Sequence, residues 1–348
     1  QRLSFLTLKN KIMKKVKQVI GIDVSKDTLA VCYGFTTETQ ATSYTKPASF
    51  FNNLKGFTKL LQWIEELKDE KTDLCFVMEA TGVYYENLAY FLSENRQVVH
   101  VLLPNKTKHF AKSLDIKSKT DEIDAKMLTQ IGLERQLLKW QPQSENLHLI
   151  KQICREYKDL KEKLTIVKNQ LHAKDHAYNS SKQVIKRLKA QERFLETQLL
   201  QVEHELRVLC SEDEELNEKI QKIQTVPGLS FITIITIIAE TNAFSLIENS
   251  KQLCSYCGFD VIHNQSGIYK GKSKMSKKGN RFIRRALYMP ALCAIKHNPT
   301  LKAFYNQLTE RKNVKKVGIT AVARKMLVLT YALWKNSAEF ELNYKKAA

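Results

Sequence analysis

The stretch from Glu145 to Thr225 contains neither proline nor glycine, and charged residues dominate it. Apolar residues recur there at steps of three and four positions, first between Leu147 and Leu171 and again between Leu188 and Leu209. This spacing places the apolar side chains on one face of a helix over several turns, as in helices that pair with each other. The polar segment at 179–181 separates the two runs. The sequence therefore predicts a long helical hairpin or coiled coil over residues 145–222.

This helical middle divides the chain into three regions. We interpret it as an arm for oligomerisation or spacing; the alternative is a helical bundle that packs on its own domain. A chain of 348 residues fits two or three domains, and here residues 13–140 precede the arm and residues 223–340 follow it. Residues 1–12 carry no motif. Because Met13-Lys-Lys-Val-Lys opens the first predicted strand, we interpret residues 1–12 as upstream or added sequence.

Residues 13–140 alternate strand-like and helix-like patterns. Lys17–Val24 and Thr28–Tyr33 are β-rich and are joined by a short polar turn, which predicts a β-hairpin. Apolar spacing predicts a helix over residues 50–67. The other expected elements are strands over 73–80 and 98–103, the second closed by Pro104, and a helix around 84–93. A hairpin followed by such alternation indicates an α/β domain with a mixed sheet flanked by helices.

Residues 223–340 are predicted to form a mainly helical domain. Thr225-Val-Pro-Gly-Leu before an apolar helix resembles half of a helix-hairpin-helix, in which backbone N–H groups approach a phosphate. Ser230 stands where a second glycine is usual in that motif, and a purely structural turn explains the segment equally well. The stretch Ile319–Trp334 is apolar on one helical face, so we expect it in the core.

Three segments of the first region place carboxylates where a divalent metal can use them. Asp23 and Glu79 sit at the ends of apolar, β-rich runs, where a buried acid is costly unless a cation offsets its charge. Asp121 and Asp124 lie three positions apart at the start of a helical stretch, so both project from one face. Four acids that converge on one point suit a two-metal site that cuts phosphodiesters.

The charge of the chain indicates a polyanionic partner. Its 56 Lys and Arg against 36 Asp and Glu give a net charge of +20, which supplies salt-sensitive affinity for phosphate backbones. The alternatives are a generic basic surface, a solvated helix face for some of the cations, or attraction to anionic membranes. The cations cluster before the Asp121/Asp124 pair and again around residues 270–285. The candidate nucleic-acid-binding residues are Lys106, Lys108, Lys112, Lys119, Lys270, Lys272, Lys274, Lys277, Lys278, Arg281, Arg284 and Arg285.

The cysteines and apolar segments bear on the location of the protein. Seven scattered cysteines, mostly in apolar segments, indicate reduced thiols in a cytosolic protein. Cys254 and Cys257 form a CxxC pair without a second ligand pair at zinc spacing, so we predict core packing for both. The apolar tract at 231–239 is too short to cross a bilayer, and no signal peptide is evident. We expect a cytoplasmic protein with no membrane partner.

A serine lies just before the second basic cluster. Ser266 is followed by Gly267 in a polar loop, and a serine can attack phosphate when a base, a metal or nearby cations activate it. Ser-Gly is also an ordinary loop dipeptide, and spacing alone does not single this serine out. Ser273 and Ser276 are nearby alternatives, whose other expected role is phosphate contact. The chain contains no GxxxxGK[ST] phosphate loop, in agreement with chemistry that needs no ATP.

The ordered set of motifs is more specific than any one of them. It comprises Asp23 in GIDVSKDT, Glu79 in MEATGVY, Lys119-Thr-Asp121-x-x-Asp124-Ala125, the charged helical middle, VPGL, Leu253-x-x-Tyr256-x-Gly258, Gln265-Ser266-Gly267 and Ser276-Lys-x-Gly279-Asn280-x-x-x-Arg284-x-x-Leu287. In this order, from Met13 to about residue 335, the chain resembles the DEDD transposases of bacterial insertion sequences. These form the IS-one-ten group, to which the Piv DNA invertases are related.

The resemblance implies a fold, a site and a set of partners. Residues 13–140 would form a RuvC-like domain, an RNase H fold, in which Asp23, Glu79, Asp121 and Asp124 bind two Mg²⁺ ions that Mn²⁺ can replace. Residues 223–340 would bring Ser266 to the same DNA, so that strands are cut and rejoined through a phosphoserine link. A structured guide RNA from the same element would pair with donor and target DNA. Dimers that join into tetramers would give the 145–222 arm its purpose.

Two other functions remain alternatives. A RuvC-like junction-resolving endonuclease would use the four acids and water only, and it leaves Ser266 and the second domain without a role. A non-catalytic nucleic-acid-binding or assembly protein, descended from such an enzyme, would need neither the acids nor the serine. The presence of all five residues favours the recombinase.

Overall fold

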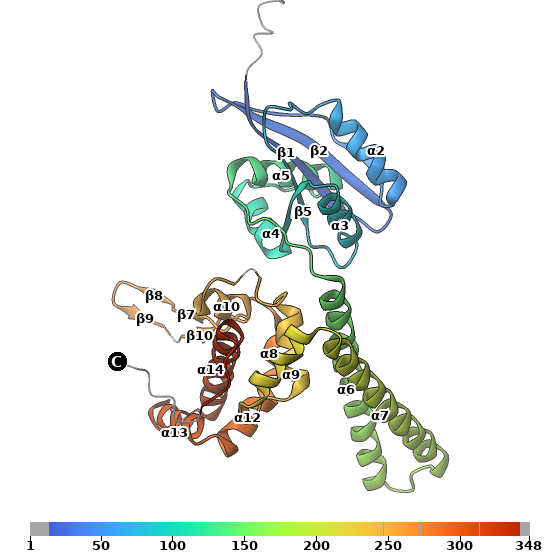
Figure 1. Ribbon diagram of the computed structural model, residues 1–348, viewed down its shortest axis with the longest axis vertical. Coiled ribbons are helices and arrows are strands. Elements are labelled where there is room, and N and C mark those ends of the chain that lie inside the picture. Colours follow the sequence, from blue (N-terminus) through green and yellow to red (C-terminus); the bar gives the residue numbers. More distant parts are fainter. Residues whose placement is uncertain (1–13, 246, 272, 313, 342–348) are drawn as a thin grey trace, which may run out of the picture. The chain divides into compact units, whose positions relative to one another are not determined.

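The computed structural model describes residues 14–245, 247–271, 273–312 and 314–341 (Figure 1). Residues 1–12 and Lys272, for which the sequence made predictions, lie outside the described residues. The chain forms two compact units, one ending at Pro142 and the other beginning at Gln143. The first is a sheet with helices and the second is mainly helical, as predicted.

A mixed sheet forms the centre of the first unit. Its strands are β1 (Lys15–Val24), β2 (Thr28–Thr37), β3 (Thr42–Tyr44), β4 (Ala48–Phe51), β5 (Leu74–Glu79) and β6 (Val98–Leu102). The order is β3-β2-β1-β5-β6, with β4 also paired to β2. β1 is antiparallel to β2 and parallel to β5, and β6 is parallel to β5. The predicted hairpin and the predicted mixed sheet are confirmed.

Helices cover both faces of this sheet because successive strand side chains point to opposite sides. On one face, Ile20 and Met78 are buried with the apolar side chains of α2 (Leu54–Glu65) and α3 (Glu86–Glu94). On the other face, Val19 and Val77 are buried with Leu128 of α5 (Asp121–Glu134), beside α4 (Pro104–Ser113). The first unit is thus a three-layered α/β domain with α5 on the face opposite α2 (Figure 1).

One predicted boundary in this unit was wrong. The helix expected over 50–67 begins only at Leu54, because Phe50 and Phe51 belong to β4 and pair with β2. Strand pairing outweighs helical spacing there, and the Asn53 side chain caps the new helix start by accepting the Gly56 N–H. Pro104 follows the end of β6, as predicted, and it is also the first residue of α4. In the first turn of a helix its missing N–H costs no hydrogen bond.

The predicted helical hairpin is confirmed in the second unit. α6 (Glu145–His176) and α7 (Lys182–Ser211) pack against each other along their length, with the reversal at 177–181 (Figure 1). Leu164 and Val202 are buried between them at predicted apolar positions. At the base of the hairpin, Ile150 and Leu206 join the same core as the C-terminal helices. Coiled-coil pairing as such stays a prediction.

The rest of the second unit is built from short helices and two small hairpins. These are α8 (Glu214–Gln224), α9 (Phe231–Glu240), α10 (Ser250–Tyr256), α11 (Arg281–Ala286), α12 (Tyr288–His297), α13 (Pro299–Lys312) and α14 (Lys315–Asn336), with β7 (Val261–Ile262) paired to β10 (Lys274–Met275) and β8 (Gln265–Ser266) paired to β9 (Tyr269–Lys270). Cys254 and Cys257 are buried in this core, as predicted.

α14 is the core helix predicted for residues 319–334. Within the described residues it is the one helix long and apolar enough, by length and composition, to cross a membrane. It packs against α8, α10, α12 and α13, and Val322, Met326 and Leu327 are fully enclosed by those helices. Its apolar character is therefore explained by burial inside the unit.

Candidate active site

Asp23 and Glu79 lie at the carboxyl ends of two neighbouring strands. The parallel register pairs Ile22 of β1 with Met78 of β5, so the two acids occupy the next positions side by side. Side-chain alternation directs both toward the face covered by α5, and both are half-buried there. Parallel pairing thus brings together two acids that are far apart in the sequence.

α5 sits close against β1 at a glycine. A side chain at Gly21 would overlap Ala125 and Thr129 of the helix. The Gly21 N–H instead donates a hydrogen bond to Thr129 Oγ1 at 3.1 Å, and the same hydroxyl lies 2.9 Å from the Cys32 carbonyl oxygen. Glycine therefore allows the strand and the helix to touch, and the threonine hydroxyl ties α5 to both β1 and β2.

The direction of α5 brings the other two acids to the same end of the sheet. Gly132, near the end of the helix, lies against an earlier position of β1 than Thr129 does, so the helix runs antiparallel to the strand. The first turn of α5, with Asp121 and Asp124, is therefore at the end of β1 that carries Asp23. Asp121 is exposed and Asp124 is half-buried.

The four carboxylates repel one another at this edge. Burial and the like charges of the other three acids raise the pKa of Asp23 from 3.8 to about 6. Burial also raises the pKa of Asp124, while the nearby ammonium of Lys119 acts against both shifts. A partly desolvated cluster of carboxylates that resists ionisation is stabilised by a bound cation, and such perturbed groups are typical of functional sites.

Thr107 of α4 holds one of the acids and was not singled out from the sequence. Its buried hydroxyl donates a hydrogen bond to Glu79 Oε2, and Thr81 Oγ1 lies 3.4 Å from Glu79 Oε1. Such contacts fix the orientation of a carboxylate before it binds a ligand. No local motif marks this threonine, because it reaches Glu79 only through the path of β6 and α4 beside β5.

The donor set fits a hard divalent cation in charge and chemistry. All four groups offer carboxylate oxygens, which Mg²⁺ and Mn²⁺ prefer, and a cation would relieve their repulsion. Among the residues that the structure describes, no three acidic, histidine or cysteine side chains form a ready coordination shell. The metal-binding role of the four acids therefore stays a prediction, supported by topology and electrostatics.

Ser266 lies in the second unit, in a short hairpin rather than in the predicted loop. It pairs with Tyr269 across β8 and β9, and Gly267 makes the turn with a φ of +55°, a conformation that glycine adopts readily. The serine side chain is exposed, and in the described part of the chain its hydroxyl has no hydrogen-bond partner. Within the described residues, backbone pairing alone positions this side chain.

The two alternative serines have different surroundings. Ser273 Oγ lies 3.1 Å from Nδ1 of the exposed His263, and a serine beside an imidazole can be activated as a nucleophile. Ser276 is tied into its loop: its N–H donates to the Asp260 carbonyl, and its Oγ accepts the Lys278 N–H. Of the two, Ser273 is the one with a partner suited to proton transfer.

The candidate nucleic-acid-binding cations are mostly exposed. The exposed ones are Lys106, Lys108, Lys112 and Lys119 in the first unit and Lys274, Lys277, Lys278, Arg281 and Arg285 in the second. The side chain of Lys270 is outside the described part of the structure, as is the whole of Lys272. Their contact with nucleic acid stays a prediction.

Among the candidate cations whose side chains the structure describes, Arg284 differs because it is bound to the protein backbone. Its Nη1 donates to the carbonyls of Cys257 at 2.7 Å and Gly279 at 3.0 Å, and burial lowers its pKa. Asn280 adds a second link, since its side-chain amide donates to Glu240 Oε2 at 2.7 Å. The Ser276–Leu287 motif therefore has a structural function, in holding α11 against α9 and α10.

Comparisons with known proteins find matches to both units of the chain. A profile described as a transposase, of the DEDD type of IS110, matches residues 20–174, which include all four acids. A second profile, for the transposase IS116/IS110/IS902 family, matches residues 220–306, which include Ser266. DEDD transposase domains are RNase H-like, in agreement with the sheet of the first unit, and divalent-metal dependence is general among them.

Relatives extend the match over nearly the whole chain. The pilin gene-inverting proteins of Moraxella bovis and Moraxella lacunata are each 29% identical over 332 residues, which are 93% of this chain and 98% of theirs. The transposase for insertion sequence element IS1111A of Coxiella burnetii is 27% identical over 121 residues, 34% of this chain and 33% of its own. Because successive parts of the chain match both profiles in order, the protein belongs to the IS116/IS110/IS902 family of transposases.

Proposed function

We propose that this protein is a DNA recombinase of a bacterial insertion sequence that cuts and rejoins strands with four carboxylates and a serine nucleophile. Membership of a family of transposases and DNA invertases implies a DNA substrate. The observation that carries the proposal is the meeting of four carboxylates at one edge of the sheet, where burial and then their like charges raise the pKa of Asp23. A fold gains no stability from such repulsion, so a bound cation is the physical reason to retain it.

The proposed role of the carboxylates is to bind divalent cations in fixed positions. The residues proposed to hold two Mg²⁺ ions, which Mn²⁺ can replace, are Asp23, Glu79, Asp121 and Asp124. When bound, these ions supply electrostatic stabilisation of the attacking and leaving oxygens of a phosphodiester. The protein contributes orientation, because Thr107 fixes Glu79 and Thr129 ties α5 to the sheet. The exposed Lys119 beside the acids attracts the DNA phosphate.

Ser266 takes up the cut strand. Its Oγ bonds to the phosphorus of the scissile phosphodiester, the bond from phosphorus to the leaving sugar oxygen breaks, and the hydroxyl proton ends on that sugar oxygen. The resulting phosphoserine retains the energy of the broken bond. A sugar hydroxyl that attacks the phosphoserine restores the serine and rejoins the strand. Hydrolysis would discard that energy.

The partners follow from the same proposal. Donor and target DNA are the substrates, and a structured guide RNA from the same element pairs with both, so that base pairing reads sequence while the protein reads backbone and shape. The cations of the second basic cluster hold the nucleic-acid backbone. The α6–α7 hairpin joins copies of the chain into dimers or tetramers. The reaction takes place in the bacterial cytoplasm.

The proposal is tested by a search for an SDS-resistant protein–DNA adduct in cells that carry the complete element with its flanking non-coding DNA. Wild type is compared with Ser266→Ala, and Ser273→Ala and Ser276→Ala serve as matched controls from the same segment. We expect an adduct in wild type and in both controls, and none in Ser266→Ala. Digestion and mass spectrometry then identify the modified serine.

Three other results would each contradict part of the proposal. Cleaved DNA without any adduct in wild type would indicate a hydrolytic endonuclease of the junction-resolving kind. An adduct that persists in Ser266→Ala and disappears in Ser273→Ala would move the nucleophile to the serine beside His263. Unchanged strand exchange in Asp23→Ala would mean that the carboxylates have no catalytic role.

A further inference from the structure

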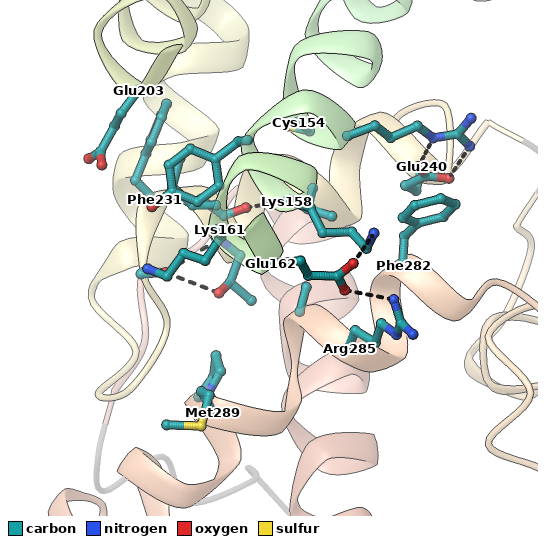
Figure 2. Close-up of a pocket in the computed structure, with 18 of the residues that line it drawn as sticks. Cys154, Lys158, Lys161, Glu162, Glu203, Phe231, Glu240, Phe282, Arg285 and Met289 are labelled. Atoms are coloured by element: carbon teal, nitrogen blue, oxygen red, sulfur yellow. Dashed lines mark hydrogen bonds and ion pairs between the residues drawn. The ribbon is translucent and has the colours of Figure 1, made fainter. Parts of the chain in front are cut away.

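A pocket of about 700 Å³ lies inside the second unit, where the base of the helical hairpin meets the C-terminal helices. Its lining comes from α6, α7, α9, α11 and α12, as Figure 2 shows for the labelled side chains. A volume of this size is in the range of pockets that enclose small organic ligands. Neither the four carboxylates nor Ser266 lines it, so the proposed reaction leaves its purpose open.

The pocket has an excess of positive charge. Five cationic and three acidic side chains line it, namely Arg155, Lys158, Lys161, Arg207, Arg285, Glu162, Glu203 and Glu240. Lys161 is exposed, and within the described residues it has no acidic partner; its ammonium lies 5.7 Å from the centre of the Tyr157 ring. An anion that enters the pocket therefore meets an available ammonium group.

The three acids offset three of the five positive charges, because each pairs with a cation of the lining, and two positive charges remain. Buried Glu240 accepts hydrogen bonds from Arg155 Nε at 2.7 Å and Nη2 at 3.1 Å. Glu203 pairs with Arg207 at 2.7 Å, one turn along α7. Glu162 lies between Lys158 at 3.3 Å and Arg285 at 2.9 Å, as the dashed lines in Figure 2 indicate. Each acid thus holds one or two cationic side chains in position at the wall of the pocket.

Apolar surface completes the lining. The guanidinium of Arg207 lies over the Phe231 ring at 4.4 Å from its centre, and that of Arg155 lies over the Phe282 ring at 4.5 Å. These contacts hold the two guanidinium groups at the aromatic rings of the wall. Met289 of α12 also lines the pocket, and 66% of this residue is exposed although it is apolar. A flexible, polarisable thioether adapts to the surface of a flat ligand.

A flat apolar group joined to an anion is the chemistry of a nucleotide, whose base packs on apolar and aromatic surface while its phosphate meets cations. We infer that this pocket binds one unstacked nucleotide, with its base against Phe231 and Met289 and its phosphate at Lys161. The nucleotide is a displaced residue of a nucleic-acid strand or a free mononucleotide. The inference rests on the proposed function in one respect, since that function supplies the nucleic-acid partner.

Cys293 offers a direct probe of the pocket. It lines the pocket, and of the seven cysteines it is the exposed one, with Cys75 partly exposed and the other five buried. Alkylation of the full chain by N-ethylmaleimide is followed peptide by peptide with mass spectrometry. The probes are a single-stranded oligonucleotide, a fully paired duplex of the same sequence, and deoxyadenosine monophosphate alone. Fluorescence anisotropy measures binding of the two oligonucleotides in parallel.

We expect the bound single strand to slow the alkylation of Cys293 by about fivefold or more, as near-saturating occupancy requires. The fully paired duplex, at equal occupancy, leaves the rate unchanged, because its bases stay stacked. Protection by the mononucleotide as well would identify a free nucleotide as a sufficient ligand. Lys161→Glu removes the protection, whereas Lys163→Glu, an exposed lysine of α6 outside the pocket lining, retains it.

Several results would overturn the inference. Single-strand binding without protection of Cys293 would mean that the strand passes elsewhere, and the proposed recombinase function would be unaffected. Equal protection by the duplex, or protection that survives Lys161→Glu, would exclude nucleotide entry as the cause. Absence of any nucleic-acid binding would contradict both proposals. A missing phosphoserine adduct with intact Cys293 protection would contradict only the proposed reaction.

Discussion

The carboxylate edge of the first unit and the serine hairpin of the second are built in opposite ways. At the edge, Glu79 is fixed by Thr107, and α5 is pinned to β1 where Gly21 leaves no room for a side chain. At the hairpin, backbone pairing is the one support of Ser266 among the described residues, and a Cβ added to Gly267 would meet nothing within 4 Å. One site is supported by side-chain and helix contacts, and the other projects from its unit.

This difference matches two chemical tasks. A cation needs its ligands held within a fraction of an ångström, which calls for groups on rigid elements with supporting contacts. A nucleophile that takes up a strand, carries it and releases it benefits from a support that moves. The two regions should therefore respond differently to the same kind of substitution.

The largest expected effect is the loss of strand exchange when the side chain of either Asp23 or Ser266 is removed. The two variants should differ in whether Mg²⁺ still stabilises them. Asp23→Ala should abolish both strand exchange and stabilisation by Mg²⁺, because it removes a ligand. Ser266→Ala should abolish strand exchange but retain the metal-induced rise in melting temperature. Recombination assays and thermal unfolding with and without Mg²⁺ measure the two properties. Loss of metal stabilisation in Ser266→Ala would break the separation between the two sites.

The next effect compares two glycines. Gly21→Ala forces a methyl group into Ala125 and Thr129, so we expect a loss of about 1–3 kcal/mol or more in the stability of the first unit, the usual range for overpacking. Gly267→Ala meets open space and costs only the strain of a positive φ, about 1 kcal/mol, confined to the hairpin. Hydrogen exchange of peptides from β1 and from β8–β9 reports each loss locally. Equal tolerance of both substitutions would contradict the packed character of the carboxylate edge.

A smaller effect is expected from Thr107→Val, which keeps the shape of the buried side chain and removes its hydroxyl. Glu79 then loses its hydrogen-bond donor, and divalent-metal affinity should fall by about 10- to 100-fold, as for other residues that orient a ligand. Isothermal titration with Mn²⁺ measures the change. Thr58→Val, at an exposed hydroxyl on the opposite face of the sheet, is the control and should leave the affinity unchanged.

The smallest effect concerns stability against pH in the absence of divalent ions. The pKa of Asp23 is about 6 in the folded protein, against 3.8 for an ordinary aspartate as in the unfolded chain. Ionisation of this carboxyl group therefore costs more free energy in the folded state. This penalty begins as pH rises above 3.8 and is complete above about 6. Asp23→Asn escapes it and should be more stable than wild type by about 1–2 kcal/mol at pH 7.5, after allowance for solvent screening.

The same comparison at pH 4 provides the control, because the carboxyl group is then almost neutral in the folded state and only about half ionised in the unfolded chain, so most of the advantage should be lost. Addition of Mg²⁺ at pH 7.5 should reverse the order, since only wild type retains all four acids. Urea unfolding followed by near-ultraviolet circular dichroism measures these differences. A wild type that is the more stable protein at pH 7.5 without metal would disprove the repulsion.

Sequence reasoning located most of the fold because its signals were local. The hairpin of β1 and β2, the strand that ends in Glu79 and the long helices of the arm all follow from periodicity and turn residues. The prediction failed at Phe50 and Phe51, which were assigned to a helix and belong to β4. A short strand that pairs with β2 has no local sequence pattern that distinguishes it from the start of an apolar helix.

The candidate site was less predictable where it depends on tertiary contacts. Asp23 and Glu79 were visible as acids in apolar strands, but Thr107 meets Glu79 only through the folded path of α4. The backbone contacts of Arg284 were equally hidden, since a basic cluster gives no sign of which cation turns inward. The nucleotide-sized pocket is lined by residues from five helices, so no single segment of the sequence predicts it.

The close seating of α5 on β1 has a consequence for how the carboxylate edge relaxes. On a flexible support, like charges would move apart and so repel each other less. Here the hydrogen bond to Thr129 and the close contact at Gly21 keep α5 against β1, so the helix cannot move away. The remaining relief is uptake of a counter-ion. The edge thus resembles a fixed-charge ion-exchange resin, which swaps protons for divalent cations as the solution becomes less acidic while its matrix keeps one shape.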